Sequence, residues 1–155
     1  MKKFFFVILM SFILTQGTYA QIYNQQITDI DKARREIKNN IQNFQKIEKI
    51  RDSTGSRYVY FKEKELQLIT VFCEDKNIDK SVEWYFSNGQ LIYSEQIWTD
   101  TKSSKTIDNE KFYLSNGHLI AWTKENNPVD NTSQEFKDVD VQLFTYAEKI
   151  KEDAK

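Results

Sequence analysis

Apolar residues recur every three or four positions near the start of this chain and every second position in its middle. The first series consists of Ile30, Ala33, Ile37, Ile41, Phe44 and Ile47, separated by charged and amide side chains. This spacing places the apolar side chains on one face of an amphipathic helix. We therefore expect a helix over residues 29–50, which Asp29 or Thr28 could cap and which the polar run 52–56 would end.

The middle of the chain repeats a short motif in which Asn-Gly stands between two apolar runs. Residues 85–92 read YFSNGQLI, residues 113–120 read YLSNGHLI, and residues 60–66 (YFKEKEL) are a weaker copy. Asn-Gly favours a two-residue hairpin turn, because both central residues of a type I′ turn need a positive φ. We expect three hairpins, about six antiparallel strands, over residues 57–124. Lys64 replaces Gly in the first copy, so a four-residue loop is expected there.

Counting outward from tight turns decides which side chains face each other and share a side of the sheet. The expected cross-strand pairs are Phe86 with Leu91, Trp84 with Tyr93, Leu114 with Leu119, Phe112 with Ala121, Phe61 with Leu66, and Val59 with Leu68. Val82, Ile97 and Phe72 would join them. This side is strongly apolar, and we expect helices to cover it.

A second amphipathic pattern follows Pro128. Its apolar positions are Phe136, Val139, Leu143, Ala147 and Ile150. Thr132 and Glu135 have the spacing of a capping box, so we expect a helix over residues 132–151. The predicted fold is α+β: an antiparallel meander of about six strands with an N-terminal and a C-terminal helix packed on one face.

Alternation assigns the remaining strand residues to the other face, which we expect to be open to solvent. The candidate binding residues on this face are Tyr58, Tyr60, Tyr85, Ile92, Trp98, Tyr113, Ile120 and Trp122. Tyrosine and tryptophan are enriched in protein interfaces, and their rings also stack on sugars. Both residue types favour strands whatever their function, so a purely structural role is a third interpretation.

The first twenty residues have the pattern of a secretory signal peptide. Lys2 and Lys3 precede an apolar run over residues 4–14, and small residues lead to Ala20. We expect cleavage after Ala20, which leaves one secreted or periplasmic domain over residues 21–155; an uncleaved membrane anchor is the alternative. The remaining chain has no second long apolar run, so we expect no membrane association after cleavage.

Charge and cysteine content limit the partners. The net charge is −1 and the basic residues form no block, so nucleic acid is not an expected partner. Cys73 is the only cysteine, so its thiol is either buried or available to join two chains.

Catalytic and metal-binding motifs are weak. His118 is the only histidine and has no carboxylate near it in the sequence to orient it as a base. Asp75, Asn77 and Asp79 resemble the start of an EF-hand loop, but Lys80 stands where that loop needs Gly. We assign no catalytic residue, no metal site and no cofactor.

The aromatic-x-Asn-Gly-x-Leu unit resembles variant MORN-type repeats, which also occur in bacterial antitoxin-like proteins. The whole chain is similar to small secreted proteins of Gram-negative bacteria. The resemblance covers residues 57–124 and implies a binding scaffold. We therefore expect a non-enzymatic module that presents its aromatic face to a protein partner, as an inhibitor or immunity-like protein would. A carbohydrate or small-ligand binding protein using the same face is the alternative.

Overall fold

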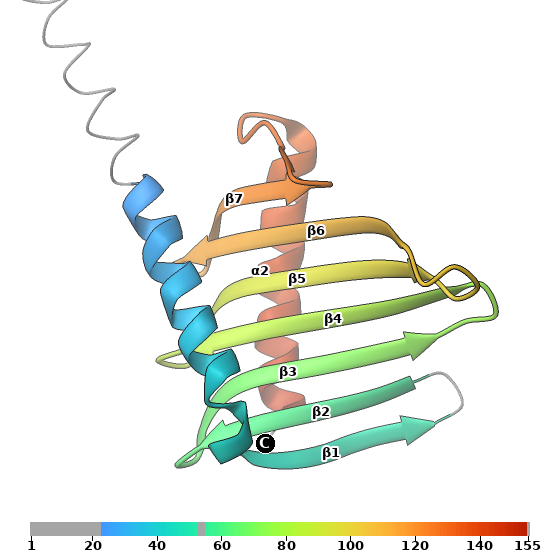
Figure 1. The fold of residues 1–155 in the computed structure, drawn as a ribbon. Helices are drawn as coiled ribbons and strands as arrows, with labels where there is room; N and C mark the ends of the chain where they lie inside the picture. Colours follow the sequence, from blue (N-terminus) through green and yellow to red (C-terminus); the bar gives the residue numbers. More distant parts are fainter. Residues whose placement is uncertain (1–22, 53–54, 155) are drawn as a thin grey trace, which may run out of the picture.

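The computed structural model describes residues 23–52 and 55–154. Within these residues one antiparallel sheet of eight strands follows the order of the chain, so that each strand pairs with the next (Figure 1). A helix over residues 23–39 precedes the sheet, and α2 (Gln134–Ala154) follows it. The strands are β1 (Gln45–Asp52), β2 (Gly55–Lys62), β3 (Glu65–Glu74), β4 (Ile78–Ser87), β5 (Gln90–Asp100), β6 (Thr106–Ser115), β7 (His118–Lys124) and β8 (Asn127–Pro128). The predicted α+β meander is confirmed, with eight strands in place of about six.

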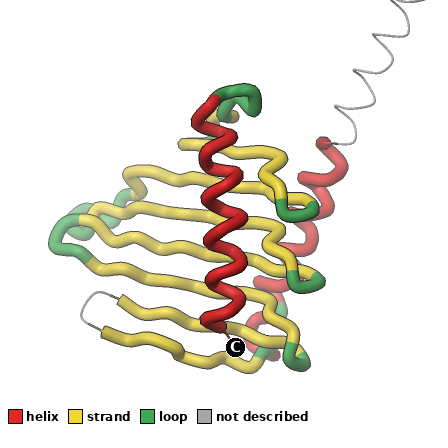
Figure 2. Tube along the Cα trace, turned by 180° about the vertical axis from the view of Figure 1, so that it is seen from behind, coloured by secondary structure: helices red, strands yellow, loops and turns green. Residues whose placement is uncertain are grey.

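The two helices lie on opposite faces of the sheet, so the prediction that both pack on one face is wrong. Figure 1 shows the N-terminal helix in front of the strands and α2 behind them, and Figure 2 shows the reverse view. Each helix has its own buried cluster. The cluster on what we call the α2 face includes Val59, Ile69, Phe86, Phe112, Leu114, Trp122, Phe136 and Leu143. The cluster on the N-helix face includes Ile30, Ile37, Leu68, Tyr85 and Tyr93.

A β-bulge lies beside each of three turns, and beyond it the observed pairing is shifted from the predicted pairing. The first pair beyond each turn is as expected: Phe61 with Leu66, Phe86 with Leu91, and Leu114 with Leu119. The next pairs are Tyr60 with Leu68, Tyr85 with Tyr93, and Tyr113 with Ala121, so one residue of the second strand is skipped each time. Such an extra residue reverses the alternation of all residues beyond it.

This reversal corrects several predicted pairs and faces. Trp84 faces Ser94, Val59 faces Ile69 and Phe112 faces Trp122. As a result, Tyr93 and Leu68 lie on the N-helix face, although the sequence pattern placed them beside Trp84 and Val59.

The first hairpin closes with two residues rather than the predicted four. Glu63 and Lys64 have φ values of 51° and 81°, close to the 51° and 71° of Asn88 and Gly89 in the next hairpin. A non-glycine residue pays for this conformation with about 1–2 kcal/mol. The antiparallel pairing of β2 with β3, which starts with Lys62 and Glu65 directly outside the turn, therefore outweighs the local preference of Glu63 and Lys64.

The N-terminal helix ends earlier than predicted. The side-chain amide of Asn40 donates a hydrogen bond to the carbonyl of Glu36 at 2.8 Å, and the 3-10 turn η1 (Ile41–Asn43) leads into β1. Residues 45–50, predicted to be helical, instead form an edge strand that pairs with β2. The apolar spacing was misleading because Ile41 lies in the 3-10 turn, Phe44 directly after it and Ile47 in β1, so the three share no helix.

The start of α2 also differs by a residue or two from the prediction. The Ser133 hydroxyl accepts a hydrogen bond from the backbone N–H of Phe136 at 3.1 Å, so Ser133 is the N-cap. The hydroxyl of Thr132, which we predicted as the cap, donates to Asp130 at 2.8 Å instead.

The predicted signal peptide, residues 1–20, lies outside the described residues. No helix among the residues described is long and apolar enough to cross a membrane.

Candidate functional site

Four tyrosines lie in a row across the N-helix face, which Leu68 of β3 interrupts between the first and the second. This tyrosine row consists of Tyr60, Tyr85, Tyr93 and Tyr113. The rings of Tyr85 and Tyr93 are 5.6 Å apart and those of Tyr93 and Tyr113 are 5.1 Å apart, both edge-to-face, an arrangement that aromatic pairs favour. Tyr85 and Tyr93 are 0% exposed. The N-terminal helix therefore covers the centre of the row.

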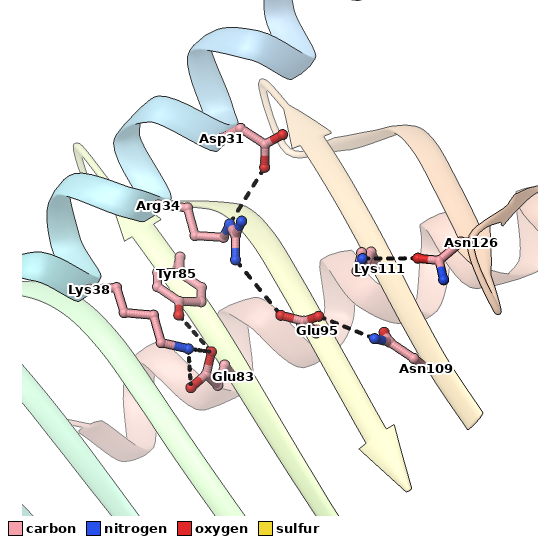
Figure 3. Close-up of polar contacts among 9 residues, drawn as sticks. All are labelled: Asp31, Arg34, Lys38, Glu83, Tyr85, Glu95, Asn109, Lys111 and Asn126. Carbon is pink, nitrogen blue, oxygen red and sulfur yellow. Dashed lines mark hydrogen bonds and ion pairs between the residues drawn. The ribbon is translucent and has the colours of Figure 1, made fainter. Parts of the chain in front are cut away.

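Two carboxylates beside the row explain how the helix is held. Glu83 and Glu95 face each other directly on β4 and β5, and like charges in that position repel. The helix supplies one cation for each: Lys38 Nζ lies 3.2 Å from Glu83 Oε2, and Arg34 Nη1 lies 3.8 Å from Glu95 Oε2 (Figure 3). Docking of the helix thus relieves a repulsion within the sheet as well as burying apolar surface.

Arg34 and the two central tyrosines complete this contact. The guanidinium of Arg34 lies 4.8 Å from the centre of the Tyr93 ring, a cation–π distance, and its Nε lies 3.5 Å from Asp31. The Tyr85 hydroxyl donates to Glu83 at 2.6 Å (Figure 3). The Tyr93 hydroxyl has no hydrogen-bond partner among the described residues. Burial raises the pKa of both phenols well above the ordinary value, so these groups stay neutral.

The eight residues predicted to form an aromatic binding face do not share an open surface. Tyr60, Tyr85, Ile92, Tyr113 and Ile120 lie on the N-helix face in the cluster that the N-terminal helix covers.

The other three predicted residues lie outside this cluster, with Tyr58 further along the N-helix face. Trp122 is only 4% exposed and belongs to the core of the α2 face. Tyr58 is half-buried, with the Lys46 ammonium 3.8 Å from its ring centre. Trp98 is half-buried beside Lys80, whose ammonium is 4.7 Å from its ring centre. The prediction of one solvent-open aromatic face is therefore wrong, because the helix fills it and the bulges divide it.

A groove with a volume of about 500 Å³ opens on the α2 face. In Figure 2 the strands extend beyond α2 on the side away from the three tight turns. The residues that line the groove come from α2 and from these outer halves of the strands. Val71, Val82 and Trp84 form its floor, and Leu143 and Ile150 of α2 form its wall. We call this the α2 groove.

The charged residues of the α2 groove are all cationic. Arg57, Lys80 and Lys149 line it together with the exposed Cys73, and no carboxylate is among its lining residues. Arg57, Val71 and Val82 follow one another across β2, β3 and β4, and Cys73 and Lys80 do so one step further out. The antiparallel ladder thus collects basic residues from distant points of the sequence.

A smaller cavity of about 280 Å³ continues the groove beyond Tyr146. Tyr146, Gln96 and Leu143 line both cavities, whereas Glu110 and Glu135 line only the smaller one. The α2 groove is therefore basic, and the smaller cavity that continues it is acidic. Sequence reasoning missed it, because no local motif joins its residues and the bulges hide which of them share a face.

His118 and Asp140 form the one histidine–carboxylate pair among the residues described. His118 is largely exposed, and its Nδ1 lies 3.3 Å from Asp140 Oδ2 of α2, a partner that the sequence did not indicate. The other oxygen of Asp140 accepts the backbone N–H of Leu119 at 2.6 Å, so this carboxylate joins α2 to β7. Among the residues described, no three His, Cys, Asp or Glu side chains are grouped to hold a metal ion.

In comparisons with known proteins, no protein-family model, curated protein or solved structure matches the chain.

Proposed function

We propose that this protein is a non-enzymatic binding module, secreted or periplasmic after loss of its first twenty residues, which binds an apolar ligand in the α2 groove. The observation that supports this function is the groove itself, about 500 Å³ in volume with Val71, Val82 and Trp84 on its floor. Small-molecule sites are concave, mainly apolar and about 300–1,000 Å³ in volume. The alternative function predicted from the sequence is a small-ligand binding protein that uses the aromatic face. We keep this class of function and propose the α2 groove as the binding site instead.

Docking of a protein partner onto the aromatic face is less well supported. A partner would have to displace the N-terminal helix, exposing Ile30 and Ile37 and leaving Glu83 and Glu95 unneutralised. The resemblance to MORN-type repeats remains a proposal, supported by the recurrence of one turn and one bulge in three hairpins.

The test is a titration of ¹⁵N-labelled mature protein with two neutral apolar probes, decanol and 1-naphthol, followed by NMR. Saturable shifts should concentrate on Val71, Val82 and the indole N–H of Trp84. Gln96 is half-buried and lines both cavities of the groove, so Gln96→Trp should fill it and abolish the shifts.

The matched control is Gln90→Trp, which places the same side chain at the exposed first position of β5. Gln90→Trp should bind both probes as the wild-type protein does. Absence of saturable binding by either probe, or shifts that Gln96→Trp leaves unchanged, would contradict the proposed function.

A further inference from the structure

The charges around the α2 groove narrow the chemistry of its ligand. The groove is lined by Arg57, Lys80 and Lys149, and no carboxylate is among its lining residues. Among the described residues, Lys80 and Lys149 form no ion pair. An apolar floor bordered by cations is complementary to a molecule with an apolar body and a negative head group. We infer that the ligand is a small anionic amphiphile, an inference that rests on the proposed function and specifies its ligand.

The basic groove and the acidic cavity that continues it also fix the orientation of this ligand. Glu110 and Glu135 line the cavity beyond Tyr146, where they would repel an anionic head. Glu110 is partly neutralised by Lys124, whose Nζ lies 3.4 Å from its Oε1, but Glu135 adds a further negative charge. The head group therefore lies at the end with Lys80 and Lys149, and the apolar body extends over Val82 and Trp84 toward Tyr146.

The position of the cations predicts the size of the head-group effect. Lys149 is exposed and Lys80 half-buried, so solvent screens their attraction for an anion, and added salt weakens it further. The apolar body should supply most of the affinity, and the charge should set a preference among head groups. Reversing one lysine should weaken binding of an anion roughly 3- to 10-fold.

Three probes with the same ten-carbon chain separate charge from apolar contact: decanoate, decanol and decyltrimethylammonium. Calorimetric titration of the full mature chain, below the critical micelle concentrations, should give the tightest binding for decanoate and the weakest for the cation. The variant Lys80→Glu/Lys149→Glu should reverse this order, and 0.5 M salt should reduce the differences in both proteins.

Lys137→Glu provides the matched control, because Lys137 is an exposed lysine of α2 that does not line either cavity. It should keep the wild-type order of probes. Far-UV circular dichroism and a cooperative thermal transition would verify that each variant is folded.

Alkylation of the single cysteine locates the bound amphiphile independently. Cys73 lines the basic α2 groove, so decanoate should slow its reaction with iodoacetamide in the wild-type protein, whereas decyltrimethylammonium at the same concentration should slow it less.

The outcomes separate the inference from the proposed function. Binding of all three probes in the groove with equal affinity would overturn the inference and leave the binding function intact. Binding of decanoate that the double charge reversal leaves unchanged would also overturn it. Binding of no probe would overturn both.

Discussion

Tyr85 and Tyr93 offer a matched pair of substitutions that tests the packing of the N-helix face. Both side chains are 0% exposed and they face each other across β4 and β5. They differ in one respect: the Tyr85 hydroxyl donates to Glu83 at 2.6 Å, whereas the Tyr93 hydroxyl has no partner among the described residues. Replacing each by phenylalanine removes one oxygen from the same environment, so the two changes should have opposite effects on stability.

The expected magnitudes follow from these contacts. A hydrogen bond to a charged group contributes about 1.5–3 kcal/mol. Glu83 keeps Lys38 as a partner and is 24% exposed, so water can replace part of the loss and Tyr85→Phe should cost about 1.5 kcal/mol. Tyr93→Phe removes a buried hydroxyl with no partner and should be neutral or stabilise by up to about 1 kcal/mol.

Urea unfolding of the two variants measures this difference directly. With an m-value of about 2 kcal/mol per M, a separation of about 2 kcal/mol moves the two midpoints about 1 M apart. Tyr146→Phe, at a 60% exposed position, should leave the midpoint within about 0.5 kcal/mol of wild type. Equal destabilisation by Tyr85→Phe and Tyr93→Phe would refute the assignment of the hydrogen bond to Tyr85 alone.

Three further predictions concern the turns, the helix cap and pH. Glu63→Asn/Lys64→Gly should raise the free energy of unfolding by about 1–2 kcal/mol, since both positions have positive φ; an unchanged urea midpoint would count against the two-residue turn. Ser133→Ala should cost about 1 kcal/mol through loss of the α2 N-cap, while Ser133→Asp should restore it in the same assay. Because burial raises the pKa of Tyr85 and Tyr93, the folded state binds protons more tightly than the unfolded state. Stability should be full below about pH 10 and fall above it; a Tyr85→Phe/Tyr93→Phe variant with an equally steep fall would contradict this.

The sequence predicts the fold well where local chemistry decides it. Asn88-Gly89 and Asn116-Gly117 specify tight turns because positive φ suits these residues, and the pairs next to each turn follow by counting. The apolar period of α2 predicts its position within two or three residues at each end. These features need no information from distant parts of the chain.

The errors arise where tertiary contacts decide the structure. A bulge is one extra residue in one strand of a ladder. Ile92 and Ile120 are such residues, and isoleucine is also common in regular strands, so their identity does not reveal the bulge. The strand β1 was predicted as helix because Ile41, Phe44 and Ile47 recur at helical spacing. One misplaced residue per hairpin was enough to mix the two faces and to put Trp122 on the wrong side.

The candidate site could not be predicted for the same reason. Arg57, Lys80 and Lys149 come from β2, β4 and α2, and only the ladder and the path of α2 bring them around one groove. In the sequence, Lys80 was considered only because it occupies the position where an EF-hand loop needs Gly. Of the eight predicted binding residues, Trp98 alone lies next to the basic α2 groove, where Lys80 covers its ring.

A crystal structure of the mature protein with decanoate is the most direct test of the central claim, that the α2 groove is the binding site. We expect ligand density over Val82 and Trp84, with the carboxylate toward Lys80 and Lys149 and the N-terminal helix still packed on the tyrosine row. Density beneath a displaced N-terminal helix, against Tyr85 and Tyr93, with an empty α2 groove, would contradict it.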